Sequence, residues 1–178
     1  APDLSLGELQ KRYGSTASNV VNVDGMRIHY KDTGPQDAPV LLLLHGFGSS
    51  LQTWDVWAAS LEQKYRVIRL DLPGFGLTGP SPSNDYSELS DVNTLTQFVD
   101  KLGVSDFSVI GHSMGGILAR CFIQLHGGAQ RVAGCVTIGS PHAGSKLAPF
   151  AVSRLGRELL PGSALLARLN AAPLPPEV

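Results

Sequence analysis

The chain has 178 residues, of which 43% are hydrophobic and 16% are charged, a size and balance that fit one globular domain with a single buried core. Its net charge of −1 provides no electrostatic attraction for nucleic acid or for an anionic membrane surface, so we expect neither as a partner. The longest apolar run, residues 40–44, is far too short to cross a bilayer, and we expect no integral membrane segment.

The first residues and the cysteines leave the compartment open. Residues 1–3 read as polar sequence rather than as a signal peptide. A small residue at position 1 fits a secreted or periplasmic chain after signal removal, and an arbitrary chain start would look the same. Cys121 and Cys135 fall inside an expected helix and an expected strand, where two buried free thiols are favoured over a disulfide.

The N-terminal part is expected to contain an arm and a hairpin. Residues 1–19 form the arm, with a short helix near residues 6–13. Two β-rich segments flank Asp24-Gly25, a dipeptide typical of a two-residue hairpin turn. Apolar residues alternate with polar ones in the second segment, which predicts one buried face and places His29 on the polar or edge face.

Strand and helix patterns alternate along the rest of the core. Continuous apolar runs predict strands that are covered on both faces, and apolar residues spaced by three and four predict helices. The expected strands are residues 40–44, 65–70, 107–110 and 132–138, and the expected helices are residues 53–64, 89–102 and 117–125. This order predicts a three-layer α/β domain over residues 20–145, with a mostly parallel sheet. Residues 146–178 are expected to form a C-terminal segment, helical over 147–169 apart from breaks at two prolines.

The segment Gly111-His112-Ser113-Met114-Gly115-Gly116 carries the strongest chemical signal. A serine two positions from a glycine on each side, between a strand and a helix, is typical of a nucleophile elbow. The serine must take strained backbone angles, and the glycines stand where a Cβ would collide with neighbouring elements. We therefore expect Ser113 to be a nucleophile for acyl transfer.

A serine nucleophile also needs donors for the oxyanion that forms when it attacks a carbonyl group. The loop His45-Gly46-Phe47-Gly48 follows the first long apolar strand and is suited to this role. The expected donors are the backbone N–H groups of Phe47 and Met114. Taken alone, the same loop would read as a plain turn between a strand and a helix.

Together these motifs resemble the α/β-hydrolase superfamily. The likeness runs from residue 20 to about residue 145 and includes the HGFG loop, the DLPGFG segment at residues 71–76 and the elbow. The resemblance implies a serine ester hydrolase, a carboxylesterase or lipase acting on small, apolar carboxylic esters without metal or organic cofactor. It implies that Asp71 closes a strand end as a structural group, and that epoxide hydrolases, which carry an aspartate where Ser113 stands, differ in mechanism.

The chain departs from that family where the acid and the base are expected. Relatives supply them after the nucleophile, in the order Ser, Asp or Glu, His. Asp106 is the last aspartate here, and the final strands of the fold are expected to be missing. His142, with Glu158 to orient it, is the candidate base; the alternative is a histidine in a polar loop that caps the next helix.

Two further residues are candidates for the substrate pocket. Trp54 is expected to line it, although core packing explains a tryptophan equally well. His112 precedes the nucleophile and is expected to support the elbow rather than to act as base.

The missing acid and base leave two alternatives to the esterase open. The chain could be a truncated or designed hydrolase core without catalysis, or a ligand-binding protein derived from a hydrolase. A sheet that ends at residues 132–138 would have a bare edge, so we expect a second copy, a complementing chain or the helices of residues 147–169 to cover it.

Overall fold

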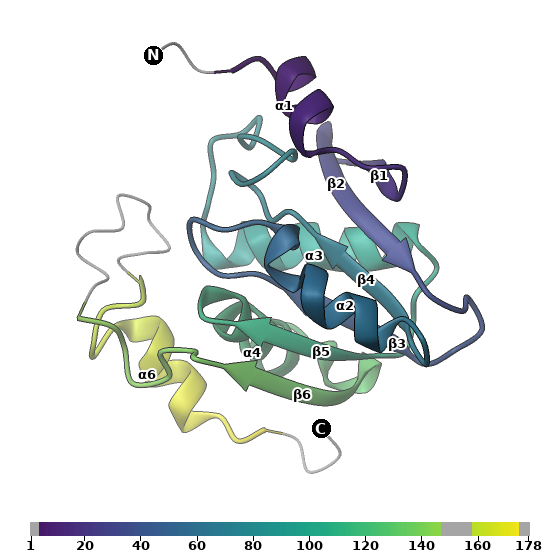
Figure 1. Ribbon diagram of the computed structural model, residues 1–178. Helices are drawn as coiled ribbons and strands as arrows, with labels where there is room; N and C mark the ends of the chain where they lie inside the picture. Colours follow the sequence, from purple (N-terminus) through teal and green to yellow (C-terminus); the bar gives the residue numbers. More distant parts are fainter. Residues whose placement is uncertain (1–3, 147–157, 175–178) are drawn as a thin grey trace.

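One six-stranded sheet organises the protein, and a computed structural model describes residues 4–146 and 158–174 of it (Figure 1). The strand order is β1-β2-β4-β3-β5-β6. β1 and β2 form an antiparallel hairpin, β2 is antiparallel to β4, and the other neighbours are parallel. The bounds are β1 Ser18–Val23, β2 Met26–Thr33, β3 Val40–Leu44, β4 Arg66–Leu70, β5 Phe107–His112 and β6 Val132–Ile138. The expected α/β class, with a mostly parallel sheet and an N-terminal hairpin, is confirmed.

Helices cover both faces of this sheet. The α-helices are α1 Leu6–Tyr13, α2 Asp55–Leu61, α3 Glu88–Lys101, α4 Met114–Leu125 and α6 Ala164–Ala171, and two 3-10 helices are η1 Leu51–Trp54 and η2 Gly128–Arg131. The single helix predicted over residues 53–64 is instead η1 followed by a seven-residue α2. Of the helical segment predicted over 147–169, residues 147–157 lie outside the described residues.

The apolar core has two parts because each buried strand contributes side chains to both faces. Leu42 and Leu44 belong to the larger cluster, which contains the apolar faces of α3 and α4. Leu41 and Leu43 point the other way and pack with Trp54 and other residues of the η1–α2 layer. The continuous apolar run of β3 thus reflects its central place in the sheet.

β6 is less buried than its apolar sequence predicts. Val132 is buried, whereas Val136 is 54% exposed, because β6 is an edge strand. Among the described residues its only strand partner is β5. α6 follows the capping residue Ser163 and inserts Leu165, Leu166 and Leu169 into the core. Coverage of the β6 edge by a second copy or a complementing chain stays a prediction.

The two cysteines are free thiols, as the sequence predicts. Cys121 is buried in α4, and Cys135 on β6 is only half-buried, because that strand lies at the edge. Burial raises the pKa of both thiols, so neither is a ready thiolate.

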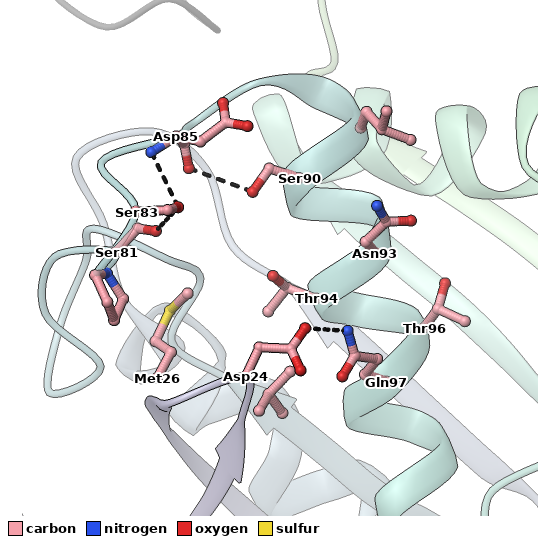
Figure 2. A pocket seen from close by; sticks show the side chains of 13 residues that line it. Asp24, Met26, Ser81, Ser83, Asp85, Ser90, Asn93, Thr94, Thr96 and Gln97 are labelled. Atoms are coloured by element: carbon pink, nitrogen blue, oxygen red, sulfur yellow. Dashed lines mark hydrogen bonds between the residues drawn. The ribbon is translucent and has the colours of Figure 1, made fainter.

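A hollow of about 450 Å³ lies between the hairpin turn, the loop at residues 81–85 and α3 (Figure 2). Hydroxyl and amide side chains line most of it, and Gln97 donates to Asp24 across the turn. Ser113 is not among its lining residues, so this hollow is separate from the elbow.

The described helices include none that is both long and apolar enough to span a bilayer. Within residues 4–146 and 158–174, no group of three or more His, Cys, Asp or Glu side chains is arranged to hold a metal ion.

Candidate active site

Ser113 occupies the turn between β5 and α4. Its backbone angles are φ 52° and ψ −118°, a left-handed conformation that a residue with a side chain rarely adopts. Such strain costs on the order of 1–3 kcal/mol and persists only where neighbouring structure holds it. Here the N–H of Ser113 donates to the carbonyl of Ile138 at the end of β6, at 2.8 Å. The strained turn expected of a nucleophile elbow is therefore present at this serine.

The flanking glycines explain how α4 packs so closely on the sheet. A Cβ at Gly111 would lie 2.4 Å from the backbone nitrogen of Gly116. A Cβ at Gly115 would lie 2.4 Å from the carbonyl oxygen of Leu44 on β3. Both distances are far below a van der Waals contact, so only glycine fits either position.

The HGFG loop lies directly against this elbow. A Cβ at Gly46 would lie 3.0 Å from the Cβ of Ser113, which puts the two backbones side by side. Phe47 is 45% exposed, and its ring packs edge-on against Phe75 with 5.5 Å between centroids. Met114 begins α4 and is buried. These positions support Phe47 and Met114 as sources of oxyanion donors, a role that stays a proposal.

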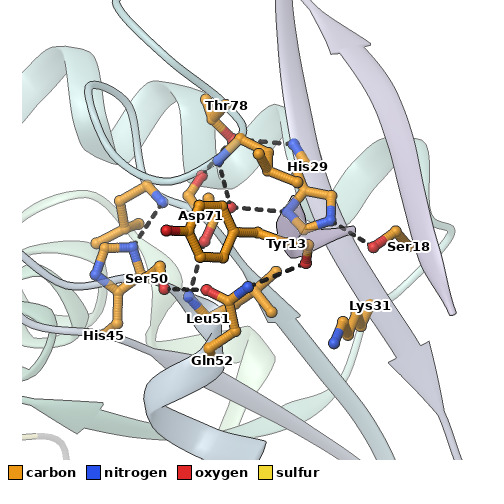
Figure 3. A network of polar contacts seen from close by, with 12 residues as sticks. Tyr13, Ser18, His29, Lys31, His45, Ser50, Leu51, Gln52, Asp71 and Thr78 are labelled. Carbon is orange, nitrogen blue, oxygen red and sulfur yellow. Dashed lines mark hydrogen bonds and ion pairs between the residues drawn. The ribbon is translucent and has the colours of Figure 1, made fainter. Parts of the chain in front are cut away.

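His45 holds the loop from within the core. Its side chain is fully buried, Nδ1–H donates to the carbonyl of Gly46 at 2.8 Å, and Nε2 accepts the N–H of Leu72 at 3.0 Å (Figure 3). This pattern requires the neutral ring with its proton on Nδ1. Burial lowers the pKa of His45 below its ordinary value. The ring therefore joins the loop after β3 to the end of β4.

We expect this neutral ring to make stability depend on pH. In the unfolded chain a histidine titrates at about pH 6.5. Because the folded pKa is lower, the unfolded state binds more protons, and the contribution of His45 is lost as pH falls below that value. At pH 7.5, His45→Gln should lower the free energy of unfolding by about 1–3 kcal/mol. Urea unfolding at pH 7.5 and pH 5 should show this difference shrink; a difference that does not change with pH would contradict the assignment.

His112 lies beside the oxyanion loop. Its Nδ1 is buried without a hydrogen-bond partner among the described residues, and a Cβ at Gly46 would lie 3.0 Å from it. A Cβ at Gly139, on the other side, would lie 4.0 Å from Nε2. The ring thus sits between the loop and the residue that follows β6, a position that supports its proposed role as a packing group for the elbow.

Among the described residues His142 makes no hydrogen bond to Ser113, and its other contacts count against the base role that stays a prediction. Arg120 donates to its Nδ1 at 2.9 Å, and its Nε2 lies 2.9 Å from the hydroxyl of Thr137. The carbonyl of His142 also accepts a hydrogen bond from the side chain of Asn170 on α6. Both ring nitrogens therefore have other partners. Burial, with smaller contributions from Asp85 and from Glu158, raises the pKa of Asp91 on α3, so Glu158 lies near that carboxyl group; its predicted role in orienting His142 stays a prediction.

Trp54 needs correction as a pocket residue. It is 2% exposed and packs with Leu41, Leu43 and Val67 in the smaller core cluster. The neighbouring Trp57 is half exposed and meets it edge-on. Trp54 is thus a core residue of the η1–α2 layer, the alternative that the sequence left open.

The sequence reasoning missed His29. It was expected on a polar or edge face, yet it is only 2% exposed. The residues after β4 fold over this face of the hairpin, and the backbone N–H of His29 donates to the hydroxyl of Thr78 at 2.9 Å. Its ring contacts Asp71, which also accepts the N–H groups of Leu51 and Leu77, as a structural group at a strand end would. The alternating pattern of the hairpin does not predict that the loop around Thr78, 49 residues beyond His29, covers this face.

Comparison with known proteins agrees with this architecture. A family model described as "alpha/beta hydrolase fold" matches residues 39–160. The chain is 42% identical over 88 residues to the magnesium-chelatase 30 kDa subunit of Rhodobacter capsulatus, a match that covers 49% of this chain and 31% of that protein. It is 35% identical over 96 residues to epoxide hydrolase 4 of Homo sapiens, covering 53% of this chain and 26% of that protein.

The crystal structure of Cfl2 from Burkholderia cenocepacia is similar with a TM-score of 0.64 at 25% identity, covering 71% of this chain and 42% of the other. The chain spans less than a third of the length of the two curated relatives. Because the family model matches more than half of the chain, the protein belongs to the alpha/beta hydrolase fold family.

Proposed function

We propose that the protein is a carboxylic ester hydrolase in which Ser113 attacks the ester carbonyl. The observation that carries the proposal is the left-handed backbone of Ser113 between β5 and α4, with the HGFG loop against it. Family membership supports hydrolase chemistry in general. A serine at this position favours an acyl-enzyme formed from an ester, whereas several matched relatives are named epoxide hydrolases.

The proposed reaction begins when Oγ of Ser113 bonds to the carbonyl carbon. The negative charge that develops on the carbonyl oxygen is stabilised by the N–H groups of Phe47 and Met114, and one such donor is worth on the order of 100-fold in rate. The positive end of the α4 dipole adds to this stabilisation. The bond between the carbonyl carbon and the ester oxygen then breaks, and the alcohol leaves with the proton that Ser113 lost, carried by solvent water. A second water hydrolyses the acyl-serine, which releases the acid and restores the hydroxyl of Ser113.

The proton of Ser113 has no assigned acceptor in the described residues. Four of the five histidines have ring partners elsewhere: His29, His45, His126 and His142. The fifth, His112, is the residue before the serine. We therefore assign the nucleophile and the donors, and no base.

A fluorophosphonate probe tests the nucleophile. We expect it to modify Ser113 at least about 100-fold faster than the other serines of its tryptic peptide, residues 102–120, because a donor pair and helix dipole act even without a base. Ser113→Ala should abolish modification of this peptide, and Ser108→Ala, a matched change on β5, should preserve it. Peptide mass mapping measures both.

The same assay tests whether His142 acts as the base. His142→Ala should change the rate of modification less than about twofold, because this ring already bonds Arg120 and Thr137. The nucleophile assignment fails if Ser113 stays unmodified in the folded protein. A large decrease in the rate of modification in His142→Ala would support His142 as the base.

A second candidate, a hydrolase core that binds an ester-like ligand without turnover, is favoured by the histidine partners described above. It would show a rise in melting temperature with a non-hydrolysable ester analogue and no product from a short-chain nitrophenyl ester. Product formation above the Ser113→Ala background would exclude it.

A further inference from the structure

A second serine of this protein has the hydrogen-bonded histidine that Ser113 lacks among the residues the structure describes. Ser18 on β1 places its hydroxyl 2.8 Å from Nε2 of His29 on β2. The other ring nitrogen, Nδ1, lies 2.7 Å from Oδ2 of Asp71 at the end of β4 (Figure 3). The two strands of the hairpin and the end of β4, 42 residues beyond His29, thus form a continuous Ser–His–Asp chain.

The hydrogen bonds around this chain set the direction of each proton. Asp71 already accepts the N–H of Leu51 at 2.7 Å and the N–H of Leu77 at 2.8 Å, and these donors suit a carboxylate. A carboxylate facing Nδ1 requires a proton there, so in the neutral ring Nε2 is the acceptor. Ser18 Oγ accepts the N–H of Ser15 at 3.1 Å, which leaves its own hydrogen for Nε2.

This order of donors is the order of a nucleophile, a base and an orienting acid. His29 is 2% exposed and its backbone N–H is also bonded, so its ring is held in one orientation. The backbone N–H of Asp71 donates to the carbonyl of His29 at 2.9 Å, which fixes the two residues to each other. The base is therefore positioned before any substrate arrives.

The serine end of the chain is open to a pocket. Ser18 and His29 both line a hollow of about 400 Å³ between the end of α1 and the hairpin. Val20 and Leu77 contribute apolar surface, and polar groups from residues 10–16 complete the wall. This volume and lining suit a short acyl group.

We propose that Ser18 is an acylation site that takes short acyl groups from activated esters. Oγ of Ser18 bonds to the carbonyl carbon while its proton passes to Nε2 of His29. The bond between that carbon and the leaving alcohol breaks, and the alcohol takes the proton from His29. The products are an O-acyl serine and the free alcohol, with Asp71 acting as a positioning residue. The proposal is independent of the function assigned to Ser113.

The test treats the intact chain with p-nitrophenyl acetate and locates the acetyl group by tandem mass spectrometry. Ser18 lies on the tryptic peptide of residues 13–27 and Ser113 on that of residues 102–120, so the two sites are separated. Ser15, on the same peptide as Ser18, is the internal control because only Ser18 contacts His29. We expect Ser18 to be acetylated at least about 100-fold faster than Ser15, the smallest effect usual for a positioned base.

Three variants complete the test. Ser113→Ala should leave acetylation of Ser18 unchanged, and Ser18→Ala should remove it while leaving the fluorophosphonate reaction of Ser113 intact. His29→Gln should slow acetylation of Ser18 at least about 100-fold. If that buried variant does not fold, the ratio of Ser18 to Ser15 in the unaltered chain decides alone. Equal acetylation of these two serines, or a folded His29→Gln protein that reacts at the normal rate, would overturn the proposal.

Discussion

Replacing Gly115 with alanine is expected to lower the free energy of unfolding by about 3 kcal/mol or more and to abolish the fluorophosphonate reaction of Ser113. The added Cβ would lie 2.4 Å from the carbonyl oxygen of Leu44 and 2.7 Å from that of His45. Both contacts are with backbone, which cannot rotate away as a side chain can. α4 would have to move off β3, and the turn at Ser113 would move with it. Urea unfolding and probe labelling measure the two effects.

Gly134→Ala is the matched control for this substitution. Gly134 lies on β6 of the same sheet, and a Cβ there would meet only the hydroxyl of Ser108 at 3.4 Å, an ordinary contact. We expect a change in stability within about 0.5 kcal/mol and normal labelling. If Gly115→Ala were as mild as Gly134→Ala, the close packing of α4 on β3 would not be what holds the elbow.

Replacing Asp91 with asparagine is expected to stabilise the protein at pH 8 by about 2 kcal/mol or more. Asp91 is 7% exposed in the first turn of α3, and its Oδ1 has no hydrogen-bond partner among the described residues. Burial, with smaller contributions from the charges of Asp85 and Glu158, raises the pKa of Asp91 to about 7. Above that pH the buried side chain of Asp91 is ionised, and its negative charge is repelled by those of Asp85 and Glu158.

The sign of the pH dependence follows from the raised pKa. Between the ordinary value near 3.8 and about 7, the folded state binds more protons than the unfolded state, so stability falls as pH rises through this window. A pKa displaced this far corresponds to about 4 kcal/mol, part of which asparagine retains as the cost of burying an amide. The gain from Asp91→Asn should therefore be large at pH 8 and small near pH 4.

Urea unfolding of the unaltered chain and of Asp91→Asn at pH 4, 6 and 8 checks this expectation. Asp100→Asn is the matched control, because Asp100 lies on the same helix with its side chain 56% exposed and bonded to Arg131. That variant should show little change with pH. A gain from Asp91→Asn that is the same at all three pH values would mean that the charge of Asp91 does not determine the effect.

The sequence predicted the strands well because their signals are local. Every residue of the run 40–44 is apolar, which predicts a strand that is buried on both faces, and β3 has these bounds. The elbow was predictable because its glycine spacing around Ser113 is itself a short sequence motif, although the contact that requires Gly115 is with Leu44 on β3. For β6 the apolar pattern was correct about the strand and wrong about burial on both faces, although the expected end of the sheet at residues 132–138 already implied an open edge.

The side-chain partners were not predictable in this way. His142 follows β6, at the same edge of the sheet as Ser113, and its ring nevertheless bonds Arg120, about two turns along α4 from the elbow. Trp54 could equally have faced a pocket or the core, and only the course of η1 against β3 decides between them. Each of these outcomes depends on contacts between residues that no periodicity links.

By itself, then, the sequence determined the α/β class, the hairpin, the elbow at Ser113 and the adjoining HGFG loop, since backbone sterics and hydrophobic periodicity act over short stretches of chain. Only the tertiary structure decided that His29 is buried, that His142 bonds Arg120 and that Ser18, His29 and Asp71 are joined. The contacts of His29 arise when the hairpin, β4 and the loop after it pack together, and the contact of His142 arises where α4 meets the segment after β6. Both depend on the order of the strands in the sheet rather than on any one segment.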